Sequence, residues 1–437
     1  MGLQSDSREF GAYLSTMVNK ETLLEELSWR GLLYQQTEGL GVHFAKGTVT
    51  AYCGYDPTAP SLHIGNLVPT MLLVHIARAG HKAIALVGGG TAMIGDPSGK
   101  SEERPLAGVD AINANAAKIH AQLSQLFKSA NTAGVSLANN ADWLLKIGAV
   151  DFMRDVGKHF SVNYMLAKDS VQSRIETGIS YTEFSYSLLQ AYDYLQLYKN
   201  HGCTLQVGGS DQWGNITAGM ELVRRSAGGE AHVLTAPLIT TASGKKFGKT
   251  EAGAVWLDPT LTSPYQFYQF WINAEDADVG RYLRMFTFMS RAEIESLEAA
   301  HAAAPHERAA QRALAAAMTT LLHGADAARV AAEVSRVIFD KKIDPASIGD
   351  DVYATLAVEI PSVRDPNAAE LNVLDVLEEA FALSRSAGRK LVQQGGVSVN
   401  GEKLAADALT VPRANAVRGR WFLVRKGGRD IALADVG

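Results

Sequence analysis

The sequence predicts an α/β protein with a parallel-sheet domain, a helical domain after it and a small α+β domain at the end. Three observations support this prediction. A strand, a turn-rich loop, a helix and a second strand follow one another within residues 48–87. Residues 264–339 are mostly helical in pattern, and beyond residue 371 two short helical segments precede a strand and turn. A strand–helix–strand order implies parallel strands joined by a crossover helix.

The first elements place a candidate site. Leucines at helical spacing predict an amphipathic helix over residues 19–36. Residues 48–53 and 82–87 are predicted strands, and a helix is expected over residues 65–79. Such sheets bind ligands at the carboxyl ends of their strands. The loops that follow Cys53 and Val87 are therefore expected to line the site.

The later elements set the expected domain boundaries. A helix is predicted over residues 182–198, and a short strand at 205–207 leads through glycines into another helix. Residues 341–370 contain three prolines and are expected to form an irregular linker. The predicted domains are a parallel-sheet domain (1–260), a helical domain (261–350), a linker (351–370) and the final α+β domain (371–437).

Length and composition fit a soluble protein of about three domains, at roughly 150 residues each. Of the 437 residues 47% are hydrophobic and 20% charged, and the net charge is −5. From residue 371 onward ten Lys and Arg face seven Asp and Glu, which gives +3 there and −8 in the rest. The final segment is thus the candidate for binding a polyanion, although a solvated basic surface explains the charge equally well.

Cysteine usage and hydropathy bear on the compartment. Cys53 and Cys203 lack zinc-ligand spacing and are too few for a disulfide framework, so a reducing cytoplasm fits best. No apolar run approaches the roughly 20 residues that span a bilayer, and residues 1–10 lack the apolar core of a signal peptide. We expect a cytoplasmic protein.

The first motif runs from Asp56 to Asn66 and directly precedes the predicted helix. A helix N-terminus offers unpaired N–H groups and a partial positive charge. Gly65 permits close approach of a phosphate or ribose, and His63 and Thr58 are potential donors to phosphate oxygens. A plain loop with a satisfied His63 is the alternative.

The second motif, Gly95-Asp96-Pro-Ser-Gly99-Lys100-Ser101, suggests a phosphate loop. A Walker A motif needs four residues between its glycines. Here only three lie between Gly95 and Gly99, and Ile94 occupies the position where the first glycine is required. The motif is therefore not a P-loop, and by itself it predicts a turn-rich loop.

The third motif is a polar line on the helix predicted at residues 182–198. Tyr186, Gln190 and Asp193 stand at i, i+4 and i+7, and therefore share one face. Burying polar groups on a largely apolar helix is costly unless a partner satisfies them. A polar ligand is one such partner, and the alternative is that this line faces solvent.

The fourth motif, Gly208-Gly-Ser-Asp211-Gln212-Trp213-Gly-Asn215, follows a predicted strand. Glycines at a strand end, followed by a carboxylate and an amide, suit the binding of sugar hydroxyls.

The fifth motif, residues 244–250, has glycines around three lysines. A mobile cationic loop of this kind suits a polyphosphate whose charge develops during reaction. An exposed basic turn is the alternative.

Together, in this order and spacing, the five segments resemble the tyrosyl-tRNA synthetase family of class I synthetases. His63-Ile-Gly-Asn66 is similar to the HIGH signature and Lys246-Phe-Gly-Lys-Thr250 to the KMSKS signature. The resemblance is dense over residues 23–251 and loose over the helical region. It implies a Rossmann-like catalytic domain and an S4-like RNA-binding module at the end.

The resemblance also implies residue roles. Tyr52 and Asp193 would contact the phenol of tyrosine, and Asp96, Tyr186 and Gln190 its ammonium group, with Gln212 also in the tyrosine site. Thr58, His63, Lys246 and Lys249 would act on the phosphates, with Lys100 and Arg104 on a second basic loop. The implied ATP-binding residues are Cys53, Asp56, His63, Gly65, Asn66, Gly209, Asp211, Lys246 and Lys249.

The implied activity is ligation of tyrosine to tRNA(Tyr) through a tyrosyl-adenylate. ATP is a substrate and is accompanied by Mg²⁺, and neither a prosthetic group nor a metal held by the protein is implied. The family also implies a homodimer. Asn66 departs from the second histidine of the HIGH signature, but it is still able to donate a hydrogen bond. A tryptophan-specific relative is one alternative, which the Tyr52 and Asp193 pair disfavours. A non-catalytic RNA-binding descendant is another, which His63, Lys246 and Lys249 disfavour.

Overall fold

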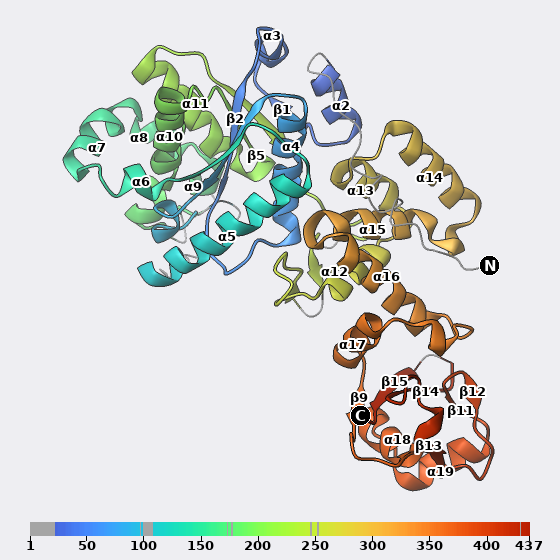
Figure 1. Ribbon diagram of the computed structural model, residues 1–437. Coiled ribbons are helices and arrows are strands. Elements are labelled where there is room, and N and C mark those ends of the chain that lie inside the picture. The colour runs from blue at the N-terminus through green and yellow to red at the C-terminus, as the bar shows by residue number, and fades with distance from the viewer. Residues whose placement is uncertain are drawn as a thin grey trace. The chain divides into compact units, whose positions relative to one another are not determined.

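The computed structural model describes residues 22–96, 98, 108–172, 174–175, 178–244, 247–250, 253–428 and 430–437, and for residues 169, 170, 249 and 250 it describes the backbone only. The chain divides into two compact units (Figure 1). The first comprises residues 1–263 and 270–322, and the second comprises 264–269 and 323–437. Two helices contribute to both units, α12 (Pro264–Ile272) and α15 (Ala309–His323).

The first unit contains a six-stranded sheet in the order β1-β6-β5-β2-β3-β4. Its five longer strands run parallel, and only the two-residue β1 pairs antiparallel, with β6. The five residues of β3 after Lys82 are all buried, as expected for a parallel strand covered on both faces. The strands are β1 (Gln35–Gln36), β2 (Thr50–Tyr55), β3 (Lys82–Val87), β4 (Val135–Asn139), β5 (Leu205–Gly209) and β6 (His232–Ala236).

Helices connect these strands in the predicted crossover manner. The buried α4 (Leu67–Arg78) joins β2 to β3 and contacts both, and α5 (Val109–Ser129) joins β3 to β4. Figure 1 shows α10 and α11 side by side, and these helices pack closely on each other. The other elements of this unit are α2 (Leu23–Trp29), α3 (Leu40–Ala45), α6 (Ala141–Leu144), α7 (Ala149–Asp155), α8 (Val162–Leu166), α9 (Asp169–Gln172), α10 (Tyr181–His201), α11 (Trp213–Ala227), β7 (Lys249–Thr250), β8 (Gly253–Ala254), α13 (Val279–Phe286) and α14 (Arg291–Ala303).

These elements confirm the predicted Rossmann-like parallel sheet, with one correction near the start. The helix expected over residues 19–36 is wrong: α2 ends at Trp29, and Gln35 and Gln36 form the edge strand β1. Gly31 adopts a φ of +72°, which breaks the helical path and which an L-residue reaches only with strain. Residues 19–21 of that prediction lie outside the described residues.

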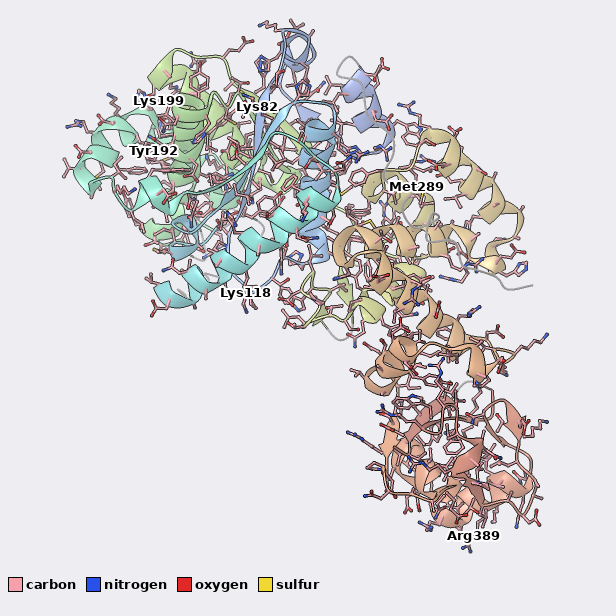
Figure 2. The ribbon with its side chains drawn as sticks, viewed as in Figure 1. Lys82, Lys118, Tyr192, Lys199, Met289 and Arg389 are labelled. Atoms are coloured by element: carbon pink, nitrogen blue, oxygen red, sulfur yellow. The ribbon has the colours of Figure 1, made fainter. Side chains whose placement is uncertain are left out.

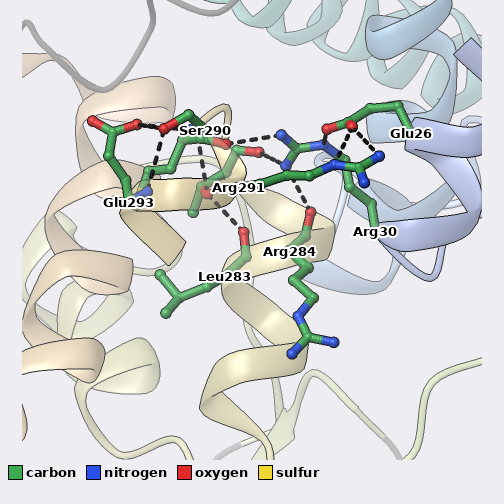
Figure 3. A network of polar contacts seen from close by, with 9 residues as sticks. Glu26, Arg30, Leu283, Arg284, Ser290, Arg291 and Glu293 are labelled. Carbon is green, nitrogen blue, oxygen red and sulfur yellow. Dashed lines mark hydrogen bonds and ion pairs between the residues drawn. The ribbon is translucent and has the colours of Figure 1, made fainter. Parts of the chain in front are cut away.

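A buried arginine ties α2 to the helical part of the first unit (Figure 3). The Arg30 guanidinium donates to the backbone oxygens of Arg284, Thr287 and Met289 at 2.8–2.9 Å, and to Glu26 Oε1 at 2.8 Å. Since four acceptors meet one buried cation, its desolvation is largely compensated. This network joins residues more than 250 positions apart.

The second unit is an α+β arrangement around a five-stranded sheet in the order β12-β11-β14-β15-β9. Along β14, Phe422 and Val424 face a core with α18 and α19, while Trp421 and Leu423 face a core with α16 and α17. This period-2 alternation covers both faces of the sheet. The elements are α16 (Ala325–Phe339), α17 (Asp350–Glu359), β9 (Ser362–Arg364), β10 (Glu370–Asn372), α18 (Val373–Phe381), α19 (Arg385–Gln393), β11 (Val397–Val399), β12 (Glu402–Lys403), β13 (Thr410–Pro412), β14 (Trp421–Lys426) and β15 (Asp430–Asp435).

The two predicted short helices and the following strand and turn are confirmed as α18, α19 and β11. The irregular linker predicted for residues 341–370 is wrong, because α17 and β9 lie within it. β9 pairs in parallel with β15, and the Tyr353 ring of α17 stacks on Trp421 at 5.5 Å between centroids. The prolines border these elements and do not interrupt them: Pro345 begins a 3-10 turn and Pro361 lies between α17 and β9.

Candidate active site

A pocket of about 600 Å³ opens at the carboxyl ends of the parallel strands, where ligands bind such sheets. It contains side chains from the loops after β2, β3 and β5 and from the polar line of α10. Fourteen of the predicted site residues line it: Tyr52, Cys53, Asp56, Thr58, His63, Gly65, Asn66, Asp96, Tyr186, Gln190, Asp193, Gly209, Asp211 and Gln212.

Four predicted cations lie wholly or partly outside the described residues. Lys246, Lys100 and Arg104 lie outside the described residues, and of Lys249 only the backbone is described. The loop that carries Lys249 nevertheless reaches the pocket, because Phe247 lines it.

A chain of hydrogen bonds crosses the floor of the pocket. Tyr186 Oη donates to Asp56 Oδ2 at 2.8 Å, and Thr91 Oγ1 donates to Asp56 Oδ1 at 2.7 Å. Asn140 Nδ2 donates to Thr91 Oγ1 and to Asp193 Oδ2, both at 2.9 Å. This chain of hydrogen bonds links the loop after β2 to α10. Tyr186 and Asp193 are buried, which excludes the interpretation that the polar line of α10 faces solvent.

Gly88, directly after β3, leaves the space that this series of hydrogen bonds needs. A Cβ atom at this position would lie 1.9 Å from Asp56 Oδ1 and 2.4 Å from Thr91 Oγ1, the two atoms of one hydrogen bond. Any side chain here would therefore break the link between the two loops.

Asp193 is a buried carboxyl at the end of this chain. Its Oδ1 accepts a hydrogen bond from Trp143 Nε1 at 2.7 Å. Burial raises the pKa of Asp193 to about 8, although the donors Asn140 and Trp143 act in the opposite direction. A ligand group that donates a hydrogen bond here would stabilise the charged form.

Four polar atoms around the pocket are buried and have no hydrogen-bond partner among the described residues. They are Tyr52 Oη, Tyr55 Oη, Gln190 Oε1 and Gln206 Oε1. All four residues line the pocket. Such orphaned groups are costly to bury, so the pocket is built for a polar ligand that reaches both donors and acceptors.

A second polar cluster surrounds Asp96. Its Oδ2 accepts from Gln212 Nε2 at 2.7 Å, and its Oδ1 accepts from the Ser98 backbone N–H at 2.9 Å. Asn215 Nδ2 is 3.4 Å from the same Oδ1. These contacts orient an acidic side chain on the pocket wall, where it can contact a cationic group of a ligand.

The His63–Asn66 segment forms a reciprocal cap on the turn η3 (Ile64–Asn66), which leads into α4. The His63 N–H donates to Asn66 Oδ1 at 2.9 Å, and the Gly65 N–H donates to His63 Nδ1 at 3.1 Å. An accepting Nδ1 leaves the neutral ring's proton on Nε2, which makes Nε2 the donor. Asn66 uses its oxygen in the cap, so its Nδ2 is the end that can donate to a ligand.

Sequence reasoning missed several residues of this site. Thr91, Asn140 and Gln206 line the pocket, and Trp143 donates to Asp193. Gln206 had a signal, because it is a polar residue inside a buried strand. Asn140 follows β4, a strand that the sequence reading did not recognise.

Comparison with known proteins places this pocket in a family. The model of the class I tRNA synthetases (W and Y) matches residues 45–340, which include the whole pocket. The model of the tyrosine–tRNA ligase SYY-like C-terminal domain matches residues 353–434. The fold and the pocket are thus those of a class I aminoacyl-tRNA synthetase.

Curated relatives refine this. The chain is 49% identical to a tyrosine–tRNA ligase of Roseiflexus castenholzii over 420 residues, covering 94% of this chain and 99% of the relative. It is 50% identical to one of Anaeromyxobacter dehalogenans over 419 residues, covering 95% of this chain and 100% of the relative. The chain belongs to the tyrosine–tRNA ligase family.

Solved structures agree. A C-terminally truncated mitochondrial tyrosyl-tRNA synthetase of Aspergillus nidulans is 32% identical, with a TM-score of 0.68 over 76% of this chain and 99% of that one. A tryptophanyl-tRNA synthetase of Plasmodium falciparum has a TM-score of 0.52 at 11% identity, over 75% of this chain and 93% of that one, which shows a shared fold alone.

Proposed function

We propose that the pocket activates L-tyrosine with ATP and that the chain then transfers the tyrosyl group to tRNA(Tyr). The observation that carries the proposal is that polar atoms without partners, among them Tyr52 Oη, Gln190 Oε1 and Gln206 Oε1, surround a pocket of amino-acid and nucleotide size. A bound amino acid with a polar side chain offers these atoms the hydrogen bonds that they lack.

At the tyrosine end, Tyr52 and Asp193 receive the phenol. Both are buried beside the same pocket, and burial, with the Asp193 carboxylate as the next cause, raises the pKa of the Tyr52 hydroxyl well above its ordinary value. Asp193 accepts the phenol proton and Tyr52 donates to the phenol oxygen. Asp96, oriented by Gln212, lies with Tyr186 and Gln190 at the ammonium end, where its carboxylate offsets the positive charge.

At the ATP end, the cap at η3 presents His63 Nε2 and Asn66 Nδ2 to the phosphates, with Thr58 and Gly65 beside them. Asp211, exposed after β5, accepts from the ribose hydroxyls, near Gly209 and Cys53. Asp56 acts mainly through others, because both its carboxylate oxygens are hydrogen-bonded to Tyr186 and Thr91.

The first step needs no general base, because the tyrosine carboxylate is already a nucleophile. It attacks the α-phosphorus of ATP, the bond to the bridging oxygen breaks, and pyrophosphate leaves. The 3′-terminal ribose hydroxyl of the tRNA then attacks the adenylate carbonyl, the bond from this carbonyl to the phosphate oxygen breaks, and AMP leaves with the hydroxyl proton on its phosphate. The role of the protein is to position these groups and to stabilise the charge that develops on the phosphates, a role that we assign to Lys246 and Lys249.

We propose that Mg²⁺ enters with the ATP substrate. The ion is held on the phosphates with water completing its shell, as Mg²⁺ prefers.

The second unit is the proposed tRNA-binding part. Arg389 and Lys390 are exposed on α19, and Arg389 projects from its outer side in Figure 2. Exposed cations on a helix suit phosphate contacts.

We also propose a cytoplasmic homodimer. Six large apolar side chains between residues 145 and 166 are exposed in the isolated chain, an arrangement typical of an interface: Leu145, Val150, Met153, Val162, Tyr164 and Leu166.

Both cysteines are buried thiols, which suits a reducing compartment. Within the described part of the chain, every helix is too short or too polar to cross a membrane. Sedimentation of the full chain tests the dimer, and cell fractionation tests the compartment.

The decisive experiment is ATP–pyrophosphate exchange with each standard amino acid, followed by charging of tRNA(Tyr). We expect exchange with tyrosine and charging of tRNA(Tyr). Exchange driven best by tryptophan would favour the relative with that specificity. Binding of tRNA without any exchange would leave only the non-catalytic alternative.

A further inference from the structure

Three metal-ligating side chains come together in the first unit, at the end of the sheet opposite the pocket. His232 is the first residue of β6, Glu230 lies two residues before it, and His43 lies on α3. One ligand atom from each lies within 4.8 Å of the other two. The cluster is therefore at the amino ends of the parallel strands, whereas the pocket is at their carboxyl ends.

A threonine hydroxyl fixes each imidazole. His43 Nε2 is 2.8 Å from Thr204 Oγ1, and His232 Nδ1 is 3.2 Å from Thr37 Oγ1. With its proton on the nitrogen that faces the threonine, each ring offers a lone pair on its other nitrogen. Metal-bound histidines are held in this way, by an outer hydrogen bond that sets tautomer and ring direction.

The two remaining nitrogens are unused. His43 Nδ1 and His232 Nε2 are buried and have no hydrogen-bond partner among the described residues. Glu230 Oε1 is 3.3 Å from His232 Nε2, close enough for both atoms to bind one cation. The two rings are 4.4 Å apart between centroids. Two buried acceptors and one carboxylate thus converge without satisfying one another.

Lys46 orients the Glu230 carboxylate. Its Nζ contacts Glu230 Oε2 at 3.2 Å and leaves Oε1 toward the rings.

We propose that His43, Glu230 and His232 form a Zn²⁺ site that fastens helix α3 to the start of β6. Two imidazoles and one carboxylate are a common zinc donor set, and water from the exposed Glu230 side completes the tetrahedron. Bonds of about 2.0–2.2 Å place tetrahedral ligands roughly 3.4 Å apart. The three ligand atoms lie within 4.8 Å of one another, so the widest gap closes by up to about 1.4 Å when the metal binds. The role is structural, because the pocket is at the other edge.

The test uses the metal-stripped full chain and two probes, Zn²⁺ by equilibrium dialysis and Co²⁺ by its visible absorption. We expect one equivalent of each, with the intense bands of a tetrahedral cobalt site, and a higher melting temperature with Zn²⁺. Glu230→Gln should weaken binding at least tenfold. Thr204→Val, which removes an outer hydrogen bond, should weaken it by about 10–100-fold. Lys46→Met should tighten it, because Lys46 competes for Glu230.

His201→Gln is the control, because this exposed histidine on α10 lies outside the cluster. It should bind as the wild type does. The double variant His43→Gln/Glu230→Gln should lose the cobalt bands while its metal-free melting curve stays cooperative. Equal zinc binding by the wild type and this double variant would overturn the proposal, as would a wild type that binds none. Pyrophosphate exchange is measured in parallel with Mg²⁺ present and should not depend on Zn²⁺. The test of the zinc site is therefore independent of the test of the proposed activity.

Discussion

Gly248 lies directly against Ile64: a methyl group on Gly248 would stand 2.3 Å from Ile64 Cγ2. The two residues belong to the two segments predicted to act on phosphates, about 180 positions apart in the sequence. Val255 joins them, since its N–H donates to Gly248 O at 3.1 Å and its carbonyl accepts from the Ile64 N–H at 2.9 Å. The cationic loop is thus seated on the turn that carries His63.

This contact predicts that Gly248→Ala impairs tyrosine activation. The added methyl cannot fit against the buried Ile64, and the φ of +78° is strained for alanine by roughly 1–2 kcal/mol. Gly244→Ala is the matched control, because Gly244 has a φ of +83° on the same loop but open space around it. We expect the rate of adenylate formation to fall at least tenfold in the first variant and much less in the second. Equal rates would mean that the contact has no part in activation.

Removal of a lysine from the same loop tests its charge. Lys246→Ala or Lys249→Ala should slow adenylate formation by about 10²–10³-fold, the usual loss for one preorganised charge-stabilising donor. Tyrosine affinity should stay nearly constant, because the phosphates and not the amino acid lose the contact. Rapid-quench measurement of adenylate formation gives the rate, and equilibrium binding gives the affinity. A variant that activates at the wild-type rate would remove that lysine from the mechanism.

The sequence predicted the site largely because its motifs lie at strand ends and on one helix face. β3 and the α10 line followed from periodicity, and Tyr186, Gln190 and Asp193 do converge. The sequence did not indicate that Asn140 bridges Thr91 to Asp193, since such a contact depends on how distant loops meet. The site residues thus follow from local pattern, and their partners only from tertiary packing.

The errors in the fold have the same origin. Gln35 and Gln36 have no strand signal of their own and become β1 because β6 offers an open edge. Residues 341–370 contain prolines and little periodicity, but α17 is held by long-range contacts such as Tyr353 on Trp421. One consequence concerns truncation: a cut after Pro361 removes the sheet that covers α16 and α17. Point variants are therefore the cleaner probes of the second unit.

Tyrosine binding should release a proton near pH 7. The pKa of Asp193 is raised to about 8 by burial, so the free protein holds this carboxyl mostly protonated at pH 7. A phenol that donates to the carboxylate displaces that proton, and affinity should rise with pH up to about 8. Calorimetry in buffers of different ionisation enthalpy should show close to one proton released. Tyr52→Phe, with Asp193 intact, should release the same number. An enthalpy that is the same in all buffers would contradict the assignment.

The same shift has a consequence for stability. The pKa of Asp193 is higher in the folded than in the unfolded chain, where it is about 3.9. Between pH 4 and 8 the folded state therefore binds more protons, and this group's contribution to stability falls as pH rises. Tyrosine should offset part of that loss, which thermal melts at pH 6 and 8, with and without tyrosine, would reveal.

Exposed cations on α19 should serve tRNA charging alone. Arg389→Ala/Lys390→Ala should weaken charging and reduce its salt dependence, because each lost phosphate contact lowers the slope by about one. Pyrophosphate exchange should be unchanged. Arg385→Ala is the matched control on the same helix, since Arg385 is already paired with Asp375 at 2.7 Å and Glu378 at 3.3 Å. Its effect on charging should be smaller. If the double variant charges tRNA normally at high salt, α19 does not contact the tRNA.

The last prediction concerns how tyrosine is distinguished from phenylalanine, which lacks one hydroxyl. A site that hydrogen-bonds the hydroxyl leaves buried groups unpaired when phenylalanine enters. Tyrosyl-tRNA synthetases are themselves the standard example of this selectivity. In this chain the groups are Tyr52 Oη and Asp193. Tyr52 Oη has no partner among the described residues, whereas Asp193 already accepts from Asn140 and Trp143. Tyr52→Phe is therefore the cleaner probe, because Asp193 also holds the network together.

Tyr52→Phe removes a buried hydroxyl that is unsatisfied without ligand, so the melting temperature of the free protein should not fall. With tyrosine, one neutral hydrogen bond is lost. The fall in kcat/KM should correspond to a loss of about 0.5–1.5 kcal/mol of transition-state stabilisation. Phenylalanine use should stay nearly constant, so the selectivity ratio falls by the same amount. Exchange assays with both amino acids, beside melts with and without tyrosine, measure every part of this. A lower melting temperature without tyrosine would show that the hydroxyl has a structural partner. An unchanged ratio would show that Tyr52 does not read the phenol.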